Sequence, residues 1–277
     1  MQTIETRRTR FKALHAERRA FLMPNPFNIG TTRILEGLRF EALATTSAGF
    51  AFTHGLKDAE GLITRDMALT HAQTIVDAST LPVNGDMENG FGDDPDDVVE
   101  TIRGAIEVGL SGCSIEDFSP DPLNPYYAFD LAVERIRAAV DTRNRLAPDF
   151  VLTARSEAPI RSEENLRETI RRLQAFADAG ADCVYAPGLV EKQHIETVIA
   201  EVSAPLNVLA GRKKFHMTRK ELEDMGVARV SIGSGLARVA FGAFTAAAES
   251  LKDSGSFGCF DREEGMEDFD LFMKGRL

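Results

Sequence analysis

Short apolar runs bounded by turn residues alternate with longer segments of helical periodicity along this chain. Eight runs have the length and apolar character of buried strands; they cover residues 21–27, 42–47, 81–86, 112–116, 150–155, 183–186, 206–210 and 229–232. Apolar residues recur at helical spacing between them, over residues 64–78, 95–108, 128–147, 163–179, 194–202, 219–225 and 236–251. Strand and helix therefore alternate throughout.

Capping signals support several of these helices: Asp94 precedes Pro95, Ser162 precedes Glu163, and glycines follow three helix ends. A doubly wound sheet would give the same alternation with fewer strands, so the eightfold count favours a (β/α)8 TIM barrel. We expect one barrel domain over residues 1–252, opened by an amphipathic helix. Residues 253–277 alternate apolar and acidic positions and are expected to form a helical extension that packs on the barrel or on a neighbouring subunit.

Composition narrows the class of partner. The chain has 277 residues, 43% of them hydrophobic, and a net charge of -11. That charge repels nucleic acids and anionic membranes, and no apolar run is long enough to span a bilayer. The three cysteines lack metal-type spacing, and Cys113 and Cys183 fall inside apolar runs, which indicates a reducing cytoplasm. The basic N-terminus contains Glu5 and Glu17 and lacks an apolar core of signal-peptide length. It is therefore expected to form the opening helix and not a targeting signal.

Acidic residues gather where two successive predicted strands end. Asp86 and Glu88 follow the third strand, and Glu116 and Asp117 follow the fourth. Barrel active sites lie at these ends, and clustered carboxylates persist most easily around a hard cation such as Mg²⁺. The alternative is that these acids cap helices or face solvent. With Arg155 from the fifth strand, the cluster suits a small carboxylate or phosphonate substrate.

Five motifs in this order resemble the isocitrate lyase and phosphoenolpyruvate mutase superfamily, over nearly the whole chain. They are TTSAG (residues 45–49), Asp58 in HGLKDAEGLITRD, GDMENGFG (85–92), SIED (114–117) and TARSEA (153–158). The resemblance implies a magnesium site, with manganese as the alternative ion, in which Asp86 ligates the metal and Asp58, Glu88 and Glu116 act mainly through water. Glu88 stands where the family more often has Asp.

The resemblance also implies where the substrate lies. Ser47, Ala48 and Gly49 align with a loop that holds the substrate carboxylate, and Arg155 aligns with the substrate-binding arginine. Thr46 and Asn207, at the ends of the second and seventh predicted strands, complete the expected substrate-binding set.

The proton donor is where the sequence departs from the family. Isocitrate and methylisocitrate lyases carry a catalytic cysteine in a KKCGH-like segment, whereas residues 118–130 read FSPDPLNPYYAFD. Pro187 stands near the histidine or glutamate expected after the sixth strand. Tyr126 and His54 are therefore the candidate catalytic residues, alongside Arg155 and Glu116; the alternative is that Tyr126 packs in its loop and His54 is simply exposed.

These residues predict a magnesium-dependent lyase that cleaves a carbon–carbon bond of a small 2-hydroxy or 2-oxo dicarboxylate through a pyruvate-like enolate. Two alternatives remain open: carbon–phosphorus chemistry as a mutase or phosphonopyruvate hydrolase, and a non-catalytic, metal-dependent binder of small acids. The resemblance further implies a homotetramer that exchanges C-terminal helices between subunits.

Overall fold

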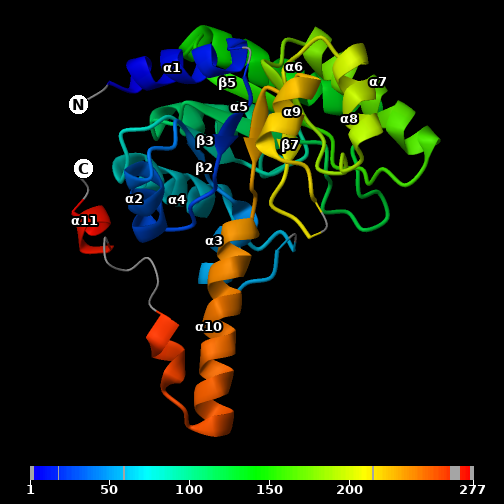
Figure 1. Ribbon diagram of the computed structural model, residues 1–277. Coiled ribbons are helices and arrows are strands. Elements are labelled where there is room, and N and C mark those ends of the chain that lie inside the picture. The colour runs from blue at the N-terminus through cyan, green and yellow to red at the C-terminus, as the bar shows by residue number, and fades with distance from the viewer. Residues whose placement is uncertain (1–2, 18, 59, 214, 263–268, 275–277) are drawn as a thin grey trace.

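Eight parallel strands form a nearly closed barrel with helices between them, as shown by the computed structural model (Figure 1). The structure describes residues 3–17, 19–58, 60–213, 215–262 and 269–274. The strands are β1 (Phe21–Met23), β2 (Leu43–Ala44), β3 (Val83–Asp86), β4 (Gly112–Glu116), β5 (Val151–Arg155), β6 (Cys183–Tyr185), β7 (Leu206–Leu209) and β8 (Arg229–Ser231). The predicted (β/α)8 barrel is confirmed.

The helices surround this barrel and continue beyond it. They are α1 (Ile4–Ala16), α2 (Ile29–Gly37), α3 (Ser47–Thr53), α4 (Arg65–Asp77), α5 (Pro95–Glu107), α6 (Phe129–Leu146), α7 (Glu163–Asp178), α8 (Lys192–Glu201), α9 (Arg219–Met225), α10 (Gly235–Ser254) and α11 (Phe269–Met273), with a short 3-10 helix η1 (Gly258–Arg262). Within the described ranges, no helix combines the length and apolar character needed to cross a bilayer.

The pairing order β1-β8-β7-β6-β5-β4-β3-β2 leaves one seam, between β1 and β2. A backbone hydrogen bond from the amide of Ala44 to the carbonyl of Pro24, 3.0 Å long, crosses that seam. Both strands are shorter than the predicted 21–27 and 42–47. Pro24 and Pro26 have no amide hydrogen to continue β1, and shortly after β2 the side chain of Thr46 caps the start of α3.

Helix α1 covers the N-terminal end of the barrel. Phe11, Leu14 and His15 are buried on its inner face, and the rings of Phe11 and His15 pack edge-on against Phe21, the first residue of β1. The side chain of His15 also contacts Arg229, the first residue of β8. Because this end is closed, a site is expected at the opposite, C-terminal end of the strands.

The C-terminal segment leaves the barrel along α10, which projects away from the other elements in Figure 1. Ala237 is the only residue of this helix that is buried. Further along, α11 lies against the barrel again. It packs on α2, and the Arg33 side chain donates a hydrogen bond to the carbonyl of Met273. Residues 263–268 and 275–277, which belong to the predicted extension, lie outside the described residues.

Candidate active site

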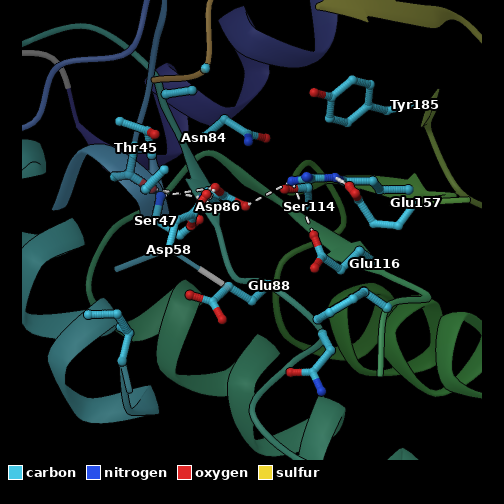
Figure 2. A pocket seen from close by; sticks show the side chains of 18 of the residues that line it. Thr45, Ser47, Asp58, Asn84, Asp86, Glu88, Ser114, Glu116, Glu157 and Tyr185 are labelled. Carbon is cyan, nitrogen blue, oxygen red and sulfur yellow. Dashed lines mark hydrogen bonds and ion pairs between the residues drawn. The ribbon is translucent and has the colours of Figure 1, made fainter. Parts of the chain in front are cut away.

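A cavity of about 720 Å³ opens at the C-terminal ends of the strands, and every strand contributes to its lining. Figure 2 shows its polar side chains pointing toward one another from different strands and loops. The titratable side chains that line it are Asp58, Arg65, Asp86, Glu88, Asp93, Glu116, Arg155, Glu157, Tyr185 and Arg229. The four predicted metal-site residues and Arg155 thus share one cavity.

Asp86, the last residue of β3, is held from two sides. Its Oδ2 accepts hydrogen bonds from the amide and the hydroxyl of Ser47, at 3.0 and 2.9 Å, and its Oδ1 lies 3.4 Å from Nη1 of Arg155. The amide of Asp86 donates to the hydroxyl of Thr45 at 2.8 Å. The ends of β2, β3 and β5 therefore meet at this carboxylate.

Arg155 is surrounded by carboxylates. Its Nη1 lies 3.1 Å from Oε2 of Glu116, and its Nε donates to Glu157. Burial works against a charged guanidinium, yet Glu116, Glu157 and Asp86 together raise the pKa of Arg155 above its ordinary value. This side chain therefore carries a positive charge in the cavity.

The carboxylates also act on one another. Burial, followed by the charges of Asp86 and Asp58, raises the pKa of Glu88 to about 7. Burial likewise raises the pKa of Glu116 well above its ordinary value; Arg155 opposes this rise, and the charges of Glu157, Asp86 and Glu88 add to it. Acids that repel one another across a cavity are the donor set that a divalent cation neutralises.

A magnesium ion fits this donor set. In the described part of the chain, no three His, Cys, Asp or Glu side chains lie close enough to ligate one ion together. Magnesium keeps several waters and is commonly held by one or two direct carboxylates, so a direct bond from Asp86 with the other acids acting through water agrees with this spacing. Glu88 also has a left-handed backbone, with φ of 45°, which is uncommon for a non-glycine residue.

The predicted substrate-binding loop is the first turn of a helix. Thr46, Ser47 and Ala48 line the cavity, and the Thr46 side chain caps α3. Gly49 does not line it: its amide donates to the Thr46 hydroxyl, and an added Cβ would lie 2.6 Å from Cγ2 of Thr46. Gly49 is thus closely packed with its amide already used, and these observations do not support its predicted contact with substrate.

Asn207, which was predicted to bind substrate, lines the cavity, and its amide group pairs with other protein side chains. Its Oδ1 accepts from Nε of Arg229 at 2.9 Å, and its Nδ2 donates to the hydroxyl of Ser231 at 3.0 Å. Arg229 also donates to Thr153 and contacts Nε2 of His15. Asn207 thus joins a buried polar network that runs across the barrel interior.

The two candidate proton donors do not line the cavity. His54 ends α3 on the surface, and its Nδ1 lies 3.2 Å from the carbonyl of Phe50, against whose ring it packs. Tyr126 pairs with Phe118 across a single β-bridge and packs edge-on against its ring. The prediction that these side chains face the substrate is not supported, because local packing directs each of them elsewhere.

Asp117 has a structural role. It is buried beneath the strand ends, where its Oδ1 accepts the amide of Glu157 at 2.7 Å. Its Oδ2 accepts from the hydroxyl of Ser156 and pairs with Nη1 of Arg172 at 3.1 Å. This carboxylate holds the loop after β5 in place and does not line the cavity.

Among the polar residues of the cavity to which sequence reasoning assigned no substrate contact are Tyr185, and Ser231 at a predicted strand end. Each is the last residue of its strand, at the end of β6 and β8 respectively. Their position in the predicted strands was the signal that could have identified them, since barrel strands place such residues at the open end.

The comparisons with known proteins agree with this geometry. The family model described as phosphoenolpyruvate phosphomutase matches residues 11–252. A candidate lyase/mutase of Burkholderia cenocepacia J2315, known from its crystal structure, is 45% identical, with a TM-score of 0.92, covering 98% of this chain and 96% of that one. The 2-methylisocitrate lyase of Escherichia coli K12 is 32% identical over 216 residues, which cover 73% of this chain and 71% of the relative.

A third similarity names the superfamily. The crystal structure of 2,3-dimethylmalate lyase, described as a member of the PEP mutase/isocitrate lyase superfamily, is 27% identical, with a TM-score of 0.84, covering 99% of this chain and 95% of that one. The match to the family model spans most of the chain and includes every strand. The chain is therefore an enzyme of the phosphoenolpyruvate mutase/isocitrate lyase superfamily.

Proposed function

We propose that this enzyme is a magnesium-dependent lyase that cleaves a carbon–carbon bond of a small 2-hydroxy or 2-oxo dicarboxylate through a pyruvate-like enolate. The observation that carries the proposal is the convergence of Asp58, Asp86, Glu88, Glu116 and Arg155 on one cavity at the open end of the barrel. Cleavage of a carbon–carbon bond is supported by relatives that are named 2-methylisocitrate lyase and 2,3-dimethylmalate lyase.

Asp86 is the residue best placed to hold the ion directly, because both of its oxygens face the groups that line the cavity. Asp58, Glu88 and Glu116 would hold its water shell, and manganese would suit the same oxygen ligands. A bound divalent ion would supply Lewis-acid stabilisation of the negative charge that develops on an enolate.

The remaining residues bind and orient the substrate. Arg155 presents a fixed positive charge beside the metal-site acids, where it can balance a substrate carboxylate and the charge that develops as the bond breaks. Thr46, Ser47 and Ala48 would seat a carboxylate at the edge of the cavity formed by α3. Glu116 is close enough to Arg155 to keep the guanidinium oriented toward the cavity.

Carbon–phosphorus chemistry is the second candidate. The matching family model describes a phosphomutase, and no cysteine lines the cavity in the described part of the chain: Cys113 and Cys183 are buried in the barrel and Cys259 lies in η1. A cysteine-dependent proton transfer like that of isocitrate lyases is therefore not available in this cavity. Phosphonopyruvate belongs in any substrate panel for this reason.

The decisive experiment incubates the purified protein and Mg²⁺ with oxaloacetate, methylisocitrate, substituted malates and phosphonopyruvate. Release of 2-oxo acid is followed by a coupled assay, and phosphorus-31 spectra follow phosphonate. Asp86→Ala should abolish turnover, whereas Asp96→Asn, an exposed carboxylate on α5, should not. Tight Mg²⁺-dependent binding with no turnover of any substrate would favour a non-catalytic binder of small acids.

We also propose that the protein is a homo-oligomer in which a second copy covers α10 and η1. Val239 and Phe244 on α10 are 69% and 73% exposed, and Phe257 and Phe260 near η1 are 73% and 56% exposed. A projecting arm, here α10 with η1, that has this many exposed apolar side chains is typical of a protein interface. The superfamily resemblance favours a tetramer.

A reducing cytoplasm is the proposed location, because all three cysteines are free thiols.

A further inference from the structure

Tyr185 occupies a place in the cavity that the proposed chemistry leaves without a role. It ends β6, and the strand register aligns it with Arg155 on β5 and Asn207 on β7. Its ring is 8% exposed, and the guanidinium carbon of Arg155 lies 5.1 Å from the ring centre. The phenol ring therefore forms a wall of the cavity immediately beside the substrate-binding arginine.

The hydroxyl group of Tyr185 forms no hydrogen bond with the described residues, and it is not one of the buried unpaired polar atoms, so it is open to the cavity. Figure 2 shows it on the side of the ring that faces the other labelled side chains of the cavity. It forms no hydrogen bond with its neighbour in the register, Asn207, whose amide pairs with Arg229 and Ser231 instead. Burial raises the pKa of Tyr185, so the hydroxyl keeps its proton and acts as a donor.

The cavity has two sides. The acids at the ends of β3 and β4, with Asp58, form one side, and Arg155 lies at its border. A fragment held between these acids and Arg155 leaves the rest of the substrate directed toward β6, β7 and β8. The hydroxyl of Tyr185 is an unsatisfied donor on that second side.

We propose that Tyr185 is a specificity-determining residue whose hydroxyl donates a hydrogen bond to an oxygen of the distal carboxylate of the substrate. The inference rests on the proposed function, since it takes the metal-site acids and Arg155 as the seat of the other end of the molecule. A hydrogen bond to a carboxylate is stronger than one between neutral groups, and a buried donor left unpaired penalises an analogue without the acceptor. Tyr185 would thus select dicarboxylates over acids with an alkyl group at that position.

The test compares two probes by calorimetry in the presence of Mg²⁺. Oxalate is short enough to occupy only the metal side of the cavity, whereas malate adds a distal carboxylate. Tyr185→Phe keeps the ring beside Arg155 and removes only the hydroxyl. It should weaken malate binding about 10- to 100-fold while oxalate binding stays within about twofold. Tyr126→Phe, outside the cavity, is the matched control and should change neither.

Each result decides a different question. Equal affinities of Tyr185→Phe and the native protein for malate would overturn the inference, and so would an equal loss for both probes, because the hydroxyl would then act only through Arg155. Failure of the native protein to bind either probe in Mg²⁺ would overturn the proposed function itself, and the inference with it. Unchanged oxalate binding confirms in the same experiment that the variant is folded.

Discussion

The amide and the hydroxyl of Ser47 donate to the same oxygen of Asp86, at 3.0 and 2.9 Å. This pair joins the first turn of α3, proposed to seat a substrate carboxylate, to the acid proposed to hold the metal. An ion that binds this oxygen would share or replace these two hydrogen bonds. The two halves of the proposed site are therefore coupled through Ser47.

Ser47→Ala should lower activity without unfolding the protein. The variant loses one hydrogen bond to a charged acceptor, a contribution of about 1.5–3 kcal/mol, so we expect kcat/KM to fall about 10- to 100-fold. Thr74→Ala, which removes a hydroxyl that donates to the carbonyl of Thr70 on α4, outside the cavity, is the control. Native-like kcat/KM in Ser47→Ala, measured with whichever substrate of the panel is turned over, would show that the Asp86 contact is not used in catalysis.

Glu88 should couple metal binding to pH. Its pKa of about 7 means that a proton and a divalent ion compete for the acidic side of the cavity near neutral pH. Between pH 6 and 8 we expect Mg²⁺ affinity to rise with pH, and the rise to be shallower in Glu88→Gln. Titration calorimetry at several pH values measures this, with Glu134→Gln on α6 as control.

The same shift predicts an effect on stability with a definite sign. The folded, metal-free protein holds the Glu88 proton up to about pH 7, whereas the unfolded chain releases it near 4.5. The contribution of Glu88 to the free energy of unfolding is therefore lost as the pH rises from about 4.5 to about 7. Denaturant unfolding without metal should show the loss in the native protein and a smaller one in Glu88→Gln; parallel curves would contradict the assignment.

His15 should make the barrel sensitive to acid. Burial, then the charge of Arg229, lowers its pKa to about 3, against an ordinary 6.5. The unfolded chain takes up this proton first, so stability from a neutral His15 falls as the pH drops below about 6.5, by up to about 1.4 kcal/mol per pH unit.

His15→Gln is the matching variant for this prediction, because its amide oxygen can still accept from Arg229. It should be less stable than the native protein at pH 7 but lose less stability between pH 7 and 5. Urea unfolding at the two pH values gives the comparison. An identical loss in both proteins would mean that His15 is already accessible to protons in the folded state.

The projecting arm should control assembly. Replacing Phe244 and Phe257 by serine removes two exposed apolar side chains from the proposed interface. We expect the native protein to run as an oligomer in size-exclusion chromatography with light scattering, and the double variant to dissociate. Lys252→Ser, an exposed polar change on the same helix, should have no effect. A native protein that stays monomeric at tens of micromolar would refute the assembly.

The sequence predicted the barrel closely and predicted its short helices poorly. All eight strands lie within the expected runs, because buried parallel strands are nearly continuous apolar segments. Helices α2 and α3 were not expected, since neither carries a long amphipathic pattern. Both are fixed by local caps, from Asn28 and Thr46 respectively, whose effect depends on the backbone that leaves β1 and β2.

By itself the sequence determined the strand count, the acids at the ends of β3 and β4 and the arginine at the end of β5, because these follow from local pattern and from motif. Only the tertiary structure decided which polar side chains share the cavity. The cavity is lined by Tyr185 and Ser231 but not by Gly49, His54 or Tyr126. These three residues pack against their close neighbours in the chain. Side-chain direction at a strand end depends on the register and stagger of the closed sheet, and these arise from contacts between residues far apart in the chain.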